Sequence, residues 1–183
     1  MNHSNALLMA LLLPLIACEP AVDACEAALS YEPSVELGIG ESEFISLESG
    51  DRVPFYSGTQ GGQHVFAAVQ TQGLVPGRSL IMGGVNDGVS IDYTLYTEDA
   101  EFGWGGGDDL AMSGTDEEAE LVGRYVYVEF WELYEAVEGE DADWDGFDYY
   151  DQDTPATLEV ELTDSCGTTV TDSRDVLLTA YGS

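Results

Sequence analysis

The sequence contains no lysine and only four arginines, against 36 acidic residues, so its formal net charge is −32. Nucleic acids and anionic membrane surfaces are bound through clusters of Lys and Arg. A chain with so few cations is therefore not expected to bind either of them. Because such a charge repels itself unless it is screened, it favours a cationic partner or bound divalent cations. A solvated acidic surface explains it equally well.

Histidine and cysteine are also scarce, with two and three residues respectively. A nucleophilic triad would depend on His64, and zinc would lack a set of nitrogen and sulfur ligands. A lone histidine beside a glycine turn is expected to have a structural role. Paired carboxylates for glycan hydrolysis stay open as an alternative, but acidic residues are so abundant that no particular pair is indicated. An enzyme is therefore not the first expectation.

No apolar run is long enough to form a membrane-spanning helix. The longest, Ala6–Ala17, falls short of the roughly twenty residues required, and Pro14 would interrupt a helix. It ends in Leu15-Ile16-Ala17-Cys18, which resembles the lipobox of bacterial lipoproteins. This resemblance implies that residues 1–17 are a signal peptide and that Cys18 becomes the first mature residue, carrying acyl chains such as palmitate. The start of the chain departs from the usual pattern, because it has no Lys or Arg.

The lipobox also predicts a location and a division of the chain. Glu19 follows Cys18 where an Asp would indicate retention at the inner membrane, so the outer membrane or cell surface is expected. An ordinary cleaved signal would instead give a secreted or periplasmic protein. Residues 18–34 are interpreted as a lipidated tether with one helical turn near Asp23–Leu29, and residues 35–183 as a single domain.

Two cysteines remain if Cys18 carries lipid. Cys25 and Cys166 form an even pair in a compartment that permits disulfides. A bridge between them would tie the beginning of the domain to its end. The alternative is two buried free thiols.

Alternating apolar and polar residues between turn signals predict an all-β fold. An antiparallel β-sandwich is expected, with an immunoglobulin-like arrangement as one option. Gly103–Gly107 is interpreted as a flexible loop and Leu121–Trp131 as a central strand. The other predicted strands are 34–37, 43–47, 53–56, 64–72, 79–82, 89–97, 108–112, 157–163 and 175–180.

One region carries a second resemblance. Glu36-Leu37-Gly38-Ile39-Gly40, Phe44, Gly50-Asp51, Gly73-Leu74 and above all Gln60-Gly61-Gly62-Gln63-His64-Val65 are similar to a pattern in uncharacterised lipoproteins of myxobacteria and related delta-proteobacteria. The resemblance implies a β-rich surface lipoprotein. It implies no activity, cofactor or catalytic residue.

An acidic run offers one candidate metal site. Asp141, Asp143 and Asp145 precede a glycine, and with the carbonyl of Phe147 and the carboxylate of Asp151 they offer the oxygen ligands that Ca²⁺ prefers. The twelfth position of an EF-hand loop is Gln152, where that motif has Glu. A structural calcium loop, a true EF-hand and a solvated acidic loop all remain open at this point.

These observations favour a lipid-anchored binding or structural module of the cell envelope. Trp104, Trp131 and Trp144, together with the many tyrosines, could line a face that binds a glycan or a protein, although such residues more often pack in the core. The rival hypotheses are a carboxylate-dependent glycan hydrolase and an acidic partner or inhibitor of a cationic protein.

Overall fold

The regular structure consists of strands and one short helix. The computed structural model describes residues 24–58, 62–77, 88–98, 100–129 and 153–180. Its elements are α1 (Ala24–Ala28), β1 (Ser34–Ile39), β2 (Ile45–Ser46), β3 (Asp51–Ser57), β4 (Gln63–Gln72), β5 (Val89–Tyr96), β6 (Glu101–Leu110), β7 (Ser113–Gly114), β8 (Ala119–Val128), β9 (Thr154–Thr163) and β10 (Thr169–Ala180). The predicted helical turn corresponds to α1, and the predicted strand at 79–82 lies outside the described residues.

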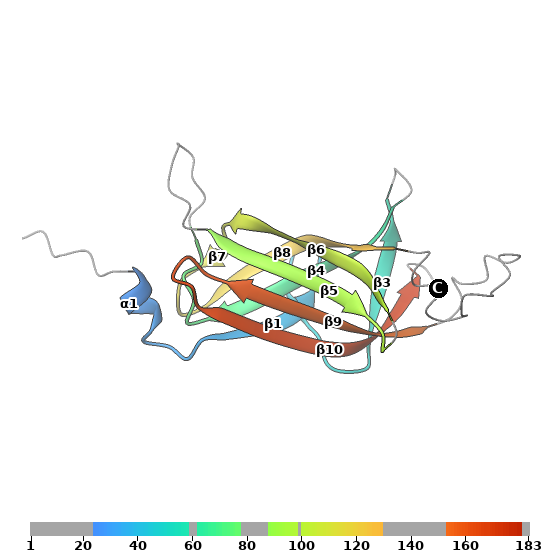
Figure 1. The fold of residues 1–183 in the computed structure, drawn as a ribbon, viewed down its shortest axis with the longest axis horizontal. Helices are drawn as coiled ribbons and strands as arrows, with labels where there is room; N and C mark the ends of the chain where they lie inside the picture. Colours follow the sequence, from blue (N-terminus) through green and yellow to red (C-terminus); the bar gives the residue numbers. More distant parts are fainter. Residues whose placement is uncertain (1–23, 59–61, 78–87, 99, 130–152, 181–183) are drawn as a thin grey trace, which may run out of the picture.

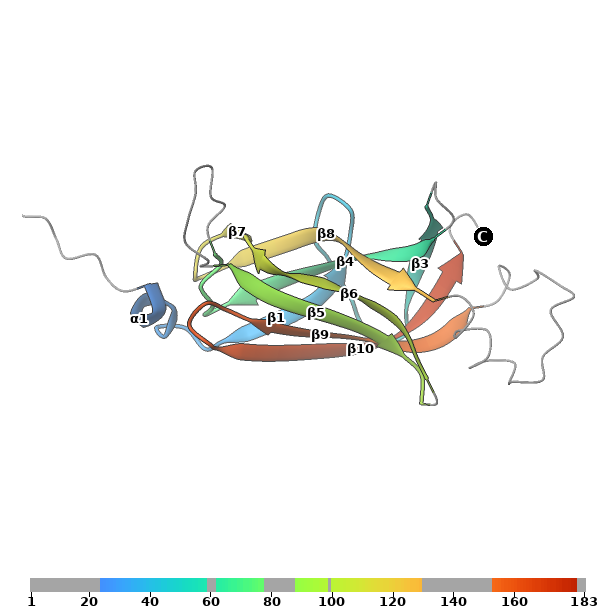
Figure 2. The ribbon, with the colours of Figure 1, turned by 45° about the horizontal axis from the view of Figure 1, so that its top comes forward.

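The strands form one sheet that closes on itself. Their order is β2-β1-β4-β3-β10-β9-β5-β6-β8-β7, and an additional pairing between β4 and β8 completes a barrel of seven strands. Strands β1, β2 and β7 extend its wall (Figures 1 and 2). The β3–β10 pair is parallel, whereas the other pairs are antiparallel. The all-β prediction is confirmed, but the sandwich is not, because hydrogen bonding continues around the sheet.

Alternation along the strands places one set of side chains inside the barrel. In β5 the inward residues are Val89, Ile91, Tyr93 and Leu95, all buried, as their spacing predicts. Strands β4 and β9 contribute aliphatic residues in the same way. Side chains at the intervening positions point outward, and these positions carry the charges and the exposed aromatic rings.

The prediction of a flexible loop at Gly103–Gly107 is wrong. These residues lie in β6, between β5 and β8. A Cβ atom on Gly105 would lie 2.2 Å from the carbonyl oxygen of Tyr125, and one on Gly106 would lie 2.0 Å from that of Ile91. Glycine is present because neighbouring backbones approach closely at these positions, not because the segment lacks regular structure.

Side chains hold β1 against β10 where no backbone ladder joins the two strands. The Leu37 amide donates to Oδ2 of Asp172 at 2.8 Å. The Arg174 guanidinium pairs with the same carboxylate, and its Nε donates to the Leu47 carbonyl at 3.0 Å. Strands β1 and β3 pair with successive parts of one edge of β4, and β3 also pairs with β10. These bonds therefore join β1 to β10 beyond the part of β4 that β3 covers.

Candidate functional site

Most residues predicted to form sites lie outside the described part of the chain. This applies to the lipidation residue Cys18, and to the proposed calcium ligands Asp141, Asp143, Asp145, Phe147 and Asp151. Within the residues that the structure describes, no group of three or more His, Cys, Asp or Glu side chains could hold a metal ion. Likewise, no helix among them is long and apolar enough to cross a membrane. The calcium loop and the anchor therefore stay predictions.

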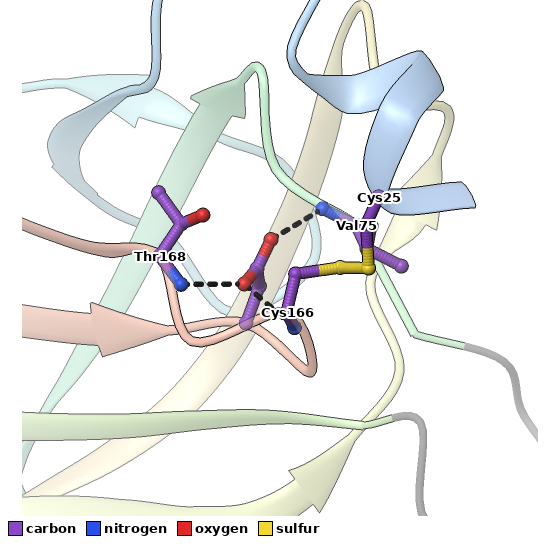
Figure 3. The surroundings of a disulfide bond; sticks show 5 residues. Cys25, Val75, Cys166 and Thr168 are labelled. Atoms are coloured by element: carbon purple, nitrogen blue, oxygen red, sulfur yellow. Dashed lines mark hydrogen bonds between the residues drawn. A yellow bond between two sulfur atoms is a disulfide. The ribbon is translucent and has the colours of Figure 1, made fainter. Parts of the chain in front are cut away.

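The predicted cysteine pair is brought together. Cys25 in α1 and Cys166 in the β9–β10 turn form a disulfide, with their Cα atoms 5.8 Å apart and a sequence separation of 141. Figure 3 shows this bond at the end of the barrel beside Val75. The bridge therefore fixes α1 to that end of the barrel.

A buried carboxylate organises the turn that carries Cys166. Asp164 is only 5% exposed. Its Oδ1 accepts hydrogen bonds from the amides of Cys166 and Thr168, both at 2.9 Å, and its Oδ2 accepts one from Val75 at 3.0 Å (Figure 3). The carboxylate therefore joins the β9–β10 turn to the segment after β4, and it holds in place the turn that carries Cys166.

The opposite half of the barrel carries a group of outward-facing rings, here called the outer aromatic face. It consists of Tyr56, His64, Phe66, Trp104, Tyr125 and Tyr127. Strand register explains why they meet: Tyr56 lies opposite His64, His64 opposite Tyr127, and Tyr127 opposite Trp104. One row of rings therefore crosses β3, β4, β8 and β6. Phe66 and Tyr125, which are also register partners, form a second row beside it.

Five of the six rings contact at least one neighbouring ring, and three of the six are largely exposed to solvent. Ring centroids lie 4.7 Å apart for His64 and Tyr125, and 5.1 Å apart for Phe66 and Tyr125. Nevertheless Trp104, Tyr125 and Tyr127 are 48%, 49% and 53% exposed. Exposed aromatic side chains are uncommon on a solvated surface, and where they cluster they typically mark a binding surface.

An acidic loop borders this face. Residues Gly40–Glu43, between β1 and β2, bond to both neighbouring strands: the Gly40 amide donates to the Phe66 carbonyl, and the Gly40 carbonyl accepts from Gly123, both at 2.9 Å. The loop therefore crosses from one neighbour of β4 to the other beyond Phe66, on the side of the strand where Ala68 is completely buried. A hollow of about 230 Å³ lies beside the loop, and its lining includes Glu41, Glu43, Tyr56 and Phe66.

Comparison with protein-family models finds no match for this chain, and neither does comparison with curated proteins. Function must therefore be argued from the geometry.

The His64 ring lies in the centre of the outer aromatic face. Burial lowers the pKa of His64, and the nearby Glu41 carboxylate opposes that shift by raising it. The net direction is downward from a value already below neutrality. The ring is therefore uncharged at pH 7 and adds an aromatic surface rather than a positive charge.

A second hollow, of about 440 Å³, includes Glu98 and Asp175 in its lining. Both side chains are exposed, and the Asp175 carboxylate accepts a hydrogen bond from the Thr157 hydroxyl at 3.0 Å. A catalytic acid in a glycosidase works from a desolvated setting. This hollow does not provide such a setting, so it gives no support to the hydrolase hypothesis.

Two polar groups inside the barrel have no hydrogen-bond partner among the described residues: the Tyr93 hydroxyl and Nε of Arg124. Tyr93 is 1% exposed. Burial raises the pKa of Tyr93, and the Arg124 charge opposes that shift. The Arg124 terminal nitrogen Nη2 donates to the Gly106 carbonyl at 3.2 Å.

Because the Tyr93 hydroxyl has no partner, Tyr93→Phe is expected to keep the stability of the protein or to raise it by about 1 kcal/mol. Tyr96→Phe is the matched control, since the Tyr96 hydroxyl donates to Glu159 at 3.2 Å. Urea unfolding of the two variants measures the difference. A larger loss for Tyr93→Phe than for Tyr96→Phe would mean that an ordered water satisfies the buried hydroxyl.

Sequence reasoning identified parts of the outer aromatic face but not the whole. The alternation of β4 and β8 separates His64, Phe66, Tyr125 and Tyr127 from the core residues, and Trp104 was named as a candidate binding residue. Trp131 and Trp144 lie outside the described residues. What the sequence did not provide was the order of the strands, which places these rings in adjoining rows.

Proposed function

We propose that this chain is a lipid-anchored binding module of a bacterial cell envelope, of the kind represented by the myxobacterial lipoproteins that its 36–74 region resembles. In this proposal Cys18 carries the lipid, and the closed barrel presents a binding surface away from the membrane. Calcium bound between Asp141 and Asp151 would be structural.

The observation that carries the proposal is the position of the outer aromatic face relative to the anchor. The disulfide holds Cys25 at one end of the barrel, and Cys18 precedes it by only a short segment, which reaches about 25 Å at full extension. The end of β4 at Gln72 pairs with Ser34, just after α1. His64 lies about 26 Å further along the same strand. A barrel anchored through Cys18 would therefore hold its exposed rings at the end distant from the lipid.

Cys18→Ala tests the anchor. Wild-type protein is expected in the membrane fraction with incorporated radiolabelled palmitate, because two or three acyl chains give stable anchoring. The variant is expected to lose the label and at least nine-tenths of its membrane association. Fractionation of cells expressing either protein, followed by immunoblotting, measures both.

The double variant Cys25→Ser/Cys166→Ser is the matched control, since it removes two cysteines but leaves Cys18. It is expected to remain labelled and membrane-bound. Membrane association of Cys18→Ala equal to that of the wild type would refute the lipoprotein assignment.

A further inference from the structure

The outer aromatic face combines exposed rings with nearby acidic groups. Glu41 and Glu43 line the hollow together with Tyr56 and Phe66, and the exposed Glu129 follows Tyr127 by two positions on the same chain. Aromatic rings present a negative π-face, which attracts cations, and carboxylates strengthen that attraction. The face is therefore electrostatically suited to a positively charged ligand.

The arginines of the described residues are engaged elsewhere and leave this face without a competing cation. Arg52 forms an ion pair with Asp153 at 2.5 Å, and Arg174 pairs with Asp172. Arg124 donates to the Gly106 carbonyl. Since the whole chain carries a formal charge of −32, the long-range field also attracts cations toward the surface.

We propose that the outer aromatic face binds an extended, arginine-bearing segment of a cationic partner protein. This inference rests on the proposed function, because it names the ligand class of that binding module. Guanidinium groups stack on tyrosine and tryptophan rings and pair with carboxylates in the same site.

The negative charge also disfavours other ligands that commonly bind an exposed aromatic surface, namely a second copy of the chain, nucleic acids, anionic lipids and glycans. A second copy of the chain would bring together two bodies of charge −32, which repel each other. Nucleic acids and anionic lipids are polyanions and are repelled for the same reason. A neutral glycan could donate hydroxyl hydrogen bonds to Glu41 and Glu43, but only a cation gains Coulombic attraction from them as well, so their presence at the edge favours a cation.

The dimensions of the face suit a short peptide. The row from Tyr56 to Trp104 crosses four strands, and three inter-strand spacings give about 14 Å. An extended segment of about five residues covers this length, with alternate side chains on one side. Three arginines at alternate positions would therefore face the rings and the acidic loop together.

The test uses the full-length chain in a non-ionic detergent and the probe peptide Arg-Ser-Arg-Ser-Arg, with binding measured by calorimetry. The matching peptide with citrulline in place of arginine keeps the shape and removes the charge. The arginine peptide is expected to bind at least tenfold more tightly than the citrulline peptide. Chitohexaose, offered as a neutral glycan, is expected to bind more weakly than the arginine peptide.

The variant Trp104→Ser/Tyr127→Ser separates ring contacts from bulk charge, because it leaves the net charge unchanged. Loss of two exposed cation–π contacts is expected to weaken binding by about five- to thirty-fold. Leu29→Ser, at the 73% exposed Leu29 of the opposite end, is the matched control and is expected to bind within twofold of the wild type. Glu41→Gln/Glu43→Gln keeps every ring and is expected to weaken binding at least threefold.

Three results would overturn the inference. The first is that the wild type and the Trp104→Ser/Tyr127→Ser variant bind the arginine peptide with equal affinity. The second is that the wild type binds the citrulline peptide as tightly as the arginine peptide, and the third is that it binds chitohexaose as tightly as the arginine peptide. Binding in detergent does not depend on the location of the protein. A failure here is therefore distinguishable from a failure of the Cys18→Ala experiment.

Discussion

Cys25→Ser/Cys166→Ser is expected to destabilise the protein by about 2 to 5 kcal/mol. The bridge closes a loop that spans 141 residues of sequence, so its removal restores a large conformational entropy to the unfolded chain. For a chain of this size, about 2–4 °C in melting temperature corresponds to each kcal/mol, which gives a fall of about 4–20 °C. Both cysteines are replaced so that neither remains as an unpaired thiol that could form an intermolecular disulfide. Circular dichroism during thermal unfolding measures the change.

Reduction provides the control for this experiment. Dithiothreitol is expected to lower the melting temperature of the wild type to that of the double variant and to leave the variant unchanged. Identical melting of wild type and variant without reductant would show that the bridge contributes nothing to stability. The buried Asp164 carboxylate, with its three amide donors, would then hold the β9–β10 turn by itself.

The strands were largely predictable from the sequence, but their closure into a barrel was not. Alternation is a local signal, and within β4, β5 and β8 it separates the inward side chains from the outward ones. The pairing of β4 with β8 and the parallel pairing of β3 with β10 join segments that lie far apart in the chain. No local pattern encodes such partners, so a sandwich and a closed barrel are equally consistent with the same strands.

The candidate site was also predictable only in part. The cysteine pair was predictable by counting, because the lipobox resemblance predicts that Cys18 carries lipid and leaves two other cysteines. The outer aromatic face was not predictable, because Trp104 lies in a glycine-rich segment whose composition is typical of a loop. A glycine-rich sequence is found both in strands and in flexible loops. The two cases differ in whether neighbouring backbones lie close to the glycines, and this is seen only in the folded structure.

Gly105→Ala is expected to cost about 3 kcal/mol of folding stability, which is large for the addition of one methyl group. The new Cβ would lie 2.2 Å from the Tyr125 carbonyl oxygen and 2.9 Å from the Val126 Cα. Backbone atoms at this distance cannot rotate away as a side chain does. Strands β6 and β8, paired through Gly103, Trp104 and Gly105, would have to separate, and this would open the barrel beside the outer aromatic face. Urea unfolding measures the loss of stability.

Gly62→Ala is the matched control, since a Cβ there meets no atom within 4 Å, and it is expected to change stability by less than about 0.5 kcal/mol. Hydrogen exchange locates the effect: amides of β8 near Tyr127 should exchange faster in Gly105→Ala than in Gly62→Ala. Because Trp104 precedes the substituted residue and lies opposite Tyr127, the arginine peptide should also bind Gly105→Ala more weakly. Unchanged stability and exchange in Gly105→Ala would mean that β6 and β8 do not lie as close together as the barrel requires. Trp104 would then not lie beside Tyr127 in the row of rings.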